Sequence, residues 1–113
     1  MQIVWPWIGF IVGALGVMAG CLLPPRWLPP LPNDKLMHFL AFGGLSFLAG
    51  KIAADDSHLL WWLAGLFIAG WLIEILQKLV PGRDFCWRDL AANTTGIVLV
   101  GSSFLLPNAW PGV

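Results

Sequence analysis

Four long apolar stretches dominate the pattern of hydrophobic and polar positions along this chain. They cover residues 7–23, 36–54, 59–80 and 90–106. Each is close to the roughly 20 residues that an α-helix needs to cross a bilayer. Helices are expected rather than strands, because a helix satisfies its backbone hydrogen bonds within its own segment. The pattern predicts an all-α fold: a polytopic membrane protein whose single domain, residues 1–113, is a bundle of four transmembrane helices.

The segments between the apolar stretches contain residues that break helices. Prolines are frequent between positions 24 and 32, and proline lacks the amide hydrogen that a helix interior needs. Asp55-Asp56-Ser57 separates the second stretch from the third, and Pro81-Gly82 ends the third. Because successive spans alternate in direction, the first and third connections lie at one membrane face, which we call the site face.

Composition agrees with a membrane protein and excludes other classes. Hydrophobic residues make up 58% of the chain and charged residues 11%, which is too apolar for a soluble domain. The chain has no basic run, so no nucleic acid is expected as a partner. The segment before the first stretch lacks the positive residues of a signal peptide, so this stretch is expected to stay as a membrane helix.

Charge is unevenly divided between the two membrane faces. The opposite face has Lys51, whereas the basic residues of the site face are Arg26, Lys35, Lys78, Arg83 and Arg88. The positive-inside rule then predicts a cytoplasmic site face. The alternative is that the arginines belong to a binding site and say little about orientation. Cys21 and Cys86 also lie at the site face, and we expect two thiols there, a disulfide being the alternative if that face is oxidising.

Four glycines form a stripe along one face of the first stretch. Gly9, Gly13, Gly16 and Gly20 recur at spacings of four, three and four, and small residues let helix backbones approach closely in lipid. The favoured interpretation is packing within the bundle, against the third or fourth helix. Gly65 with Ala69, or Ala92 with Gly96, would then supply the facing surface. The alternative is a homodimer seam.

Placing an ionisable side chain near hydrocarbon costs free energy, and Glu74 is the residue in this chain for which we expect the largest cost. It lies six residues before Val80, about 9 Å inside the expected helix end, where the helix dipole disfavours a carboxylate. It must find a cation, carry a proton or reach water. One interpretation is a buried clamp with Arg83, Arg88 or His38. The favoured one is a role in ligand binding or chemistry.

Other polar residues accompany Glu74 at the site face. Asp34 and His38 are four residues apart and share a helix face. Asp89 is expected to cap the fourth helix, with Asn93 on the same face. Glu74 and His38 are the candidate catalytic residues, since both can exchange protons. The candidate ligand-binding residues, which carry polar or charged side chains, are Asp34, Lys35, Gln77, Arg83, Arg88, Asp89 and Asn93.

No motif predicts a metal or a cofactor. Asp34, His38, Glu74 and Asp89 carry groups that ligate metals, but the chain has no H-E-x-x-H and no clustered Cys/His spacing. It also has no Gly-rich phosphate loop. Cys86 has no base at a spacing that supports a thiol nucleophile. We therefore expect neither a metal nor a cofactor.

The ordered residues between positions 33 and 101 carry a family resemblance. They are Asp34-Lys35 with His38-Phe39 and Phe42, then Glu74 with Gln77, Pro81-Gly82-Arg83, and Asp89 with Asn93 and Gly96. In order and spacing they resemble the VanZ-like membrane protein family, of which this chain would be a short form. The resemblance implies a multi-pass protein of the bacterial cytoplasmic membrane. The name-giving member is linked to resistance to the glycopeptide antibiotic teicoplanin, and most members have no assigned biochemistry.

These observations favour a site that binds or modifies an anionic lipid or a cell-envelope glycolipid. Arginines would hold the headgroup, and interfacial aromatic residues the acyl part. The residues do not distinguish binding from catalysis. One alternative is a proton-coupled small transporter, although the first stretch lacks the acidic residue on which small multidrug transporters rely. The other is a structural membrane subunit in which the polar groups clamp the helices.

Overall fold

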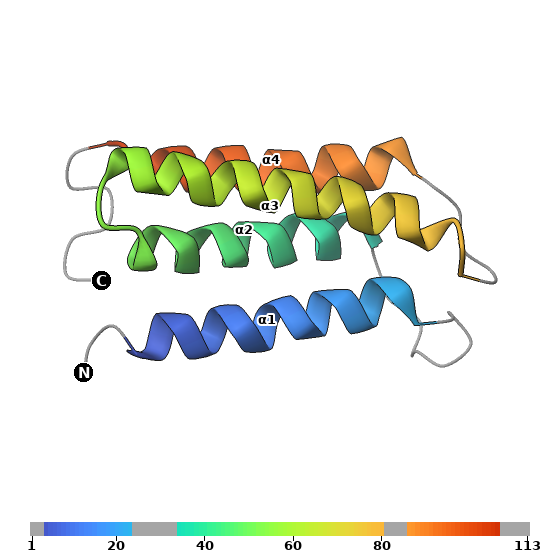
Figure 1. Cartoon of the computed structure of the whole chain (residues 1–113). Helices are drawn as coiled ribbons and strands as arrows, with labels where there is room; N and C mark the ends of the chain where they lie inside the picture. The colour runs from blue at the N-terminus through green and yellow to red at the C-terminus, as the bar shows by residue number, and fades with distance from the viewer. Residues whose placement is uncertain (1–3, 24–33, 81–85, 107–113) are drawn as a thin grey trace.

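The computed structural model of this chain describes residues 4–23, 34–80 and 86–106, and these are organised as helices throughout. The helices are α1 (Val4–Leu22), α2 (Asp34–Ile52), α3 (Asp56–Gln77) and α4 (Trp87–Ser103). Successive helices run in opposite directions; α2, α3 and α4 pack together, and α1 lies along α2 and α3 (Figure 1). The all-α prediction is confirmed, and each helix begins and ends within three residues of the stretch predicted for it.

Helices α3 and α4 begin earlier than their apolar stretches because polar residues form their first turns. Asp55 is the N-cap of α3, where its Oδ1 accepts a hydrogen bond of 2.8 Å from the backbone N–H of His58. Cys86 is the N-cap of α4 and makes no side-chain cap bond. The prediction that Asp89 caps α4 is therefore wrong. Asp89 lies within the first helical turn, where the helix dipole still favours a carboxylate.

Helix α3 ends at Gln77, ahead of the proline that was expected to end it. The backbone N–H groups of residues 78–80 each donate to a carbonyl three residues earlier, at 3.0–3.2 Å, so the chain tightens into turns. Glu74 consequently lies in the last turn of α3, about 4.5 Å from its end rather than 9 Å. The partial negative charge of this helix end acts on it strongly.

The closest helix approach lies between α2 and α4. A Cβ atom added at Gly96 would lie 2.5 Å from the carbonyl oxygen of Phe39 and 2.9 Å from the backbone nitrogen of Gly43. Only glycine fits there, because both neighbours are backbone atoms. Of all the helix pairs described, α2 and α4 share the most extensive contact. This contact fixes the relative position of the side chains that α2 and α4 contribute near their first turns.

The glycine stripe of α1 packs inside the bundle, as favoured, but against α2. A Cβ atom at Gly9 would lie 3.3 Å from Leu48, and one at Gly13 would lie 3.2 Å from Leu45. The expectation of α3 or α4 as the partner of this stripe is wrong, because the neighbours of Gly9 and Gly13 belong to α2 and Gly96 already packs against α2. A Cβ atom at Gly16 or Gly20 would meet nothing within 4 Å. A homodimer seam along this stripe stays an untested alternative.

Two apolar grooves run beside α1. The first, with a volume of about 650 Å³, lies between α1 and α2 and is lined by Gly13, Gly16, Gly20, His38 and Ala41 among others. The second, of about 610 Å³, lies between α1 and α3 and includes Ala14, Gly65 and Leu72 in its lining. Because the glycines of α1 add no side chains, the first groove extends along the helix to the level of His38.

Two of the four helices, α1 and α3, are long and apolar enough to cross a membrane. Their 19 and 22 residues correspond to about 28 Å and 33 Å, against a hydrocarbon core of roughly 30 Å. Helix α4 is shorter, at 17 residues, and α2 has Lys35 and Lys51 near its two ends. By length and composition, α1 and α3 are therefore the candidate membrane spans among the described helices.

Candidate functional site

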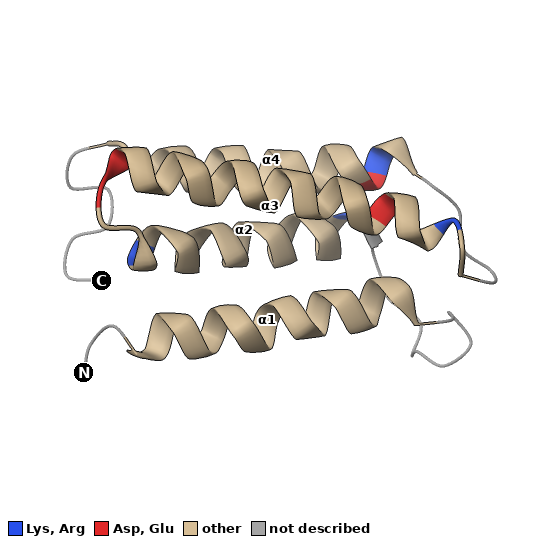
Figure 2. Ribbon diagram, viewed as in Figure 1, with Lys and Arg blue, Asp and Glu red and all other residues tan. Residues whose placement is uncertain are grey.

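Charged residues lie at the two ends of the bundle, and the middle of each described helix carries none (Figure 2). Helices α2 and α4 begin at one of these ends, where α3 finishes. We call the cluster found there the polar centre, and it comprises Lys35, His38, Glu74, Asp89 and Asn93. The structure thus brings four of the predicted site residues of α2, α3 and α4 (His38, Glu74, Asp89 and Asn93) together with Lys35 at one end of the bundle.

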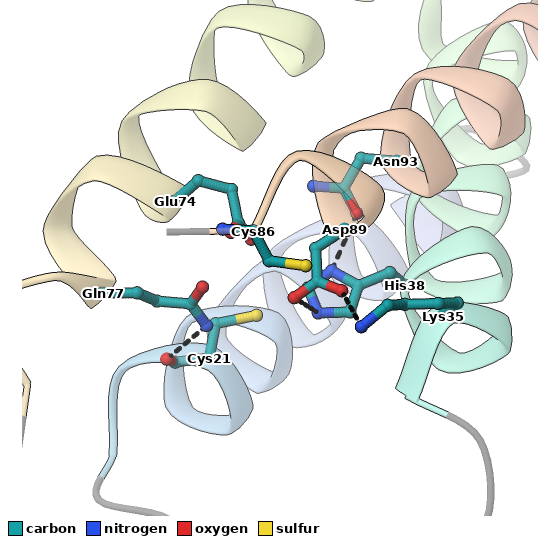
Figure 3. Close-up of polar contacts among 8 residues, drawn as sticks. All are labelled: Cys21, Lys35, His38, Glu74, Gln77, Cys86, Asp89 and Asn93. Carbon is teal, nitrogen blue, oxygen red and sulfur yellow. Dashed lines mark hydrogen bonds and ion pairs between the residues drawn. The ribbon is translucent and has the colours of Figure 1, made fainter. Parts of the chain in front are cut away.

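Three polar contacts join helices α2 and α4, and two of them share the carboxylate of Asp89. Lys35 Nζ lies 2.8 Å from Asp89 Oδ1, and His38 Nε2 lies 3.5 Å from Asp89 Oδ2 (Figure 3). On the other side of the ring, His38 Nδ1 lies 2.8 Å from Asn93 Oδ1. His38, Asp89 and Asn93 are only 7%, 6% and 1% exposed. The network is therefore largely removed from solvent, with Lys35 as its half-buried member.

Glu74 brings α3 into the polar centre. Its side chain is 0% exposed, and its Oε1 accepts a hydrogen bond of 3.2 Å from the backbone N–H of Cys86. This contact places the carboxylate at the start of α4, whose dipole favours negative charge and offsets the unfavourable end of α3. Of the predicted clamp partners, Arg88 is exposed and Arg83 lies outside the described residues. His38 is close to Glu74, as described below.

Gln77 ties α3 to α1 (Figure 3). Its Nε2 donates a hydrogen bond of 2.8 Å to the backbone carbonyl of Cys21, and its side chain is buried. Gln77 thus holds the end of α1 against α3. Cys21 and Cys86 remain thiols, as expected.

One buried polar residue, Ser46, was not among the predicted site residues. Within the residues described, Ser46 Oγ and Asn93 Nδ2 have no hydrogen-bond partner. Asn93 Nδ2 faces α3, because a Cβ atom added at Gly70 would lie 3.3 Å from it. Ser46 could have been found from its spacing, since it lies two helical turns after His38 on the same face. Asp34 begins α2, but its side chain, like Arg83, lies outside the described residues.

Three side chains of the polar centre are types that ligate metals. One donor atom each from His38, Glu74 and Asp89 lies within 4.8 Å of the other two, and all three residues are buried. Sequence spacing gave no hint of this group, because the three residues come from three different helices. The arrangement can hold a small cation, or shift a proton between an imidazole and a carboxylate.

Comparisons with protein-family models, with curated proteins and with solved structures found no match to this chain.

Proposed function

We propose that this protein is a four-span membrane protein that binds an anionic lipid or lipid-linked envelope precursor at its polar centre. The observation that carries the proposal is the groove between α1 and α2, which is apolar along its length and reaches His38. An amphipathic lipid is divided in the same way: its acyl chain would lie in the apolar groove and its polar headgroup at the polar centre. The bacterial cytoplasmic membrane is the proposed location.

The distribution of apolar side chains supports four spans rather than two. Large apolar residues are exposed on α2 and α4 as well as on α1 and α3, among them Ile8, Leu40, Ile68 and Val98. Charged and amide side chains of the polar centre are buried instead. A soluble protein rarely exposes such continuous apolar surface, whereas hydrocarbon solvates it well. Exposed Trp5, Trp61 and Trp87 near helix starts agree with interfacial aromatic belts.

The charges around the polar centre support an anionic headgroup. The side chain of Lys35 is 44% exposed although it contacts Asp89. Arg88, which precedes Asp89 in the sequence, is exposed in the first turn of α4. Guanidinium and ammonium groups bind phosphate and carboxylate oxygens through charge-assisted hydrogen bonds. Asn93 Nδ2 adds a buried donor facing α3. Together these groups complement a phosphate above an acyl chain.

Filling the groove tests this proposal. Gly16→Leu is expected to remove a co-purified anionic lipid without unfolding the protein, because a Cβ atom at Gly16 meets nothing within 4 Å. Gly65→Leu is the matched control, since Gly65 has the same open surroundings but lines the groove between α1 and α3. Native mass spectrometry in gentle detergent, with melting temperatures compared, measures the bound lipid in each variant.

Two outcomes would count against the lipid site. Wild-type protein that carries no specific anionic lipid would remove its support. Lipid lost equally from both variants would indicate general annular lipid instead of a site. If Gly16→Leu converts a dimer into a monomer while the lipid stays, the glycine stripe is a homodimer seam.

A structural clamp is the second candidate, and one observation favours it. The contacts of Lys35, His38 and Asn93 all join α2 to α4, as a clamp would. The VanZ-like resemblance stays a prediction that rests on the ordered residues of the sequence, and so does any link to glycopeptide resistance. Glu74 and His38 would exchange protons if the bound lipid is also modified.

A further inference from the structure

We propose that His38, Glu74 and Asp89 form a binding site for a divalent metal ion of the zinc or manganese class. The three donor atoms lie within 4.8 Å of one another, on three helices, at a buried position. The site departs from the sequence-based expectation of no metal. It also stands apart from the proposed lipid function, because metal binding needs only these three side chains.

The donor set suits a transition-metal ion. Imidazole is a common ligand of zinc, and carboxylates bind zinc and manganese. With metal–ligand bonds of 2.0–2.2 Å, tetrahedral donors lie about 3.4 Å apart. His38 Nε2 and Asp89 Oδ2 already lie 3.5 Å apart. An inward shift of up to about 1.5 Å by the Glu74 carboxylate would complete the triangle at the same bond lengths.

Each candidate ligand is oriented by a further contact. Asn93 Oδ1 accepts from His38 Nδ1, Lys35 binds the second oxygen of Asp89, and the backbone N–H of Cys86 holds Glu74 Oε1. Metal-bound histidine usually donates its other ring N–H to such an acceptor, which fixes the ring and its tautomer. The hydrogen bond to Asn93 therefore gives His38 the orientation of a metal ligand.

The contact between His38 and Asp89 explains what a cation would do there. With Nδ1–H donated to Asn93, a neutral His38 turns the lone pair of Nε2 toward Asp89 Oδ2 at 3.5 Å. Two acceptors that face each other are satisfied by a cation between them. Glu74 adds a second carboxylate at the same point, so two carboxylates face the single ammonium group of Lys35.

Three protein ligands leave a fourth coordination position open, as in catalytic zinc sites. The groove between α1 and α2 reaches His38. A phosphate oxygen of the ligand would fit this open position. This last step, unlike the metal site itself, rests on the proposed function.

Metal titration of the full chain tests the site. Protein in detergent, freed of its purification tag and stripped with chelator, is titrated with Zn²⁺ by calorimetry and with Co²⁺ by visible absorption. We expect one saturable site per chain and a Co²⁺ spectrum of low coordination number. His38→Gln should weaken binding at least 100-fold, and Asn93→Ala about 10- to 100-fold as an orienting residue.

The chain offers a matched control in its second histidine. His58 is exposed near the start of α3, at the opposite end of the bundle, so His58→Gln should leave the affinity unchanged. Circular dichroism confirms that each variant is folded, and Asp89→Asn replaces His38→Gln if the latter does not fold. Absence of a saturable site in the wild type, or its loss in His58→Gln, overturns the proposal. Metal binding by lipid-free protein upholds the metal site even where the lipid proposal fails.

Discussion

Gly96→Ala is expected to lower the free energy of unfolding by about 3 kcal/mol, at the upper end of what overpacking costs. The new methyl group would lie 2.5 Å from the carbonyl oxygen of Phe39 and 2.9 Å from the nitrogen of Gly43. Backbone atoms cannot rotate away as a side chain can, so α2 and α4 must move apart along their length. Alanine's better helix propensity, worth about 1 kcal/mol, offsets only part of this loss.

Thermal unfolding in detergent, followed by circular dichroism, measures the effect. Gly65→Ala is the matched control, because its added methyl group meets nothing within 4 Å and only the gain in helix propensity remains. The control should therefore melt at or above the wild-type temperature. If Gly96→Ala melts together with Gly65→Ala, the close approach of α2 and α4 is wrong.

The helices could be predicted because long apolar stretches alternate with segments that contain helix-breaking residues. Four apolar stretches of the right length led to four helices, and the bounds differ by no more than three residues. The differences arise where polar residues such as Asp55 begin a helix outside its apolar stretch. The partner of α1 could not be predicted, since a glycine stripe identifies a helix face but not the helix packed against it.

The location of the polar centre could be predicted, but its contacts could not. Alternating helix direction alone brings the ends of α2, α3 and α4 together. The spacing of Asp89 from the helix start suggested a cap, whereas the structure pairs it with Lys35 and His38. The group of three metal-ligating side chains has no sequence signature, because its members are joined by tertiary packing alone. Gln77 likewise binds a backbone carbonyl, which no side-chain pattern reveals.

Glu74→Gln is expected to abolish stabilisation by Zn²⁺ and to make the metal-free protein more stable than wild type. Carboxylate oxygens of Glu74 and Asp89 lie within 4.8 Å. Two negative charges at that separation repel by about 3.5 kcal/mol at an effective dielectric of 20. Glutamine keeps the volume and an oxygen that accepts from the N–H of Cys86. The variant also loses the favourable interaction between the Glu74 carboxylate and the dipole of α4. We therefore expect the free energy of unfolding to rise by about 1–2 kcal/mol in total.

Melting temperatures of the two proteins, each with chelator and with excess Zn²⁺, decide between the metal site and the structural clamp. Asp56→Asn is the control, because it neutralises an exposed carboxylate in the first turn of the same helix and should change stability by no more than about 0.5 kcal/mol. If the metal-free Glu74→Gln protein melts several degrees below wild type, the Glu74 carboxylate stabilises the fold by pairing with a cationic side chain of the protein. The clamp would then be the function of the polar centre. A higher melting temperature that no longer responds to Zn²⁺ means instead that the buried carboxylate lowers the stability of the empty fold and is retained for its ligand.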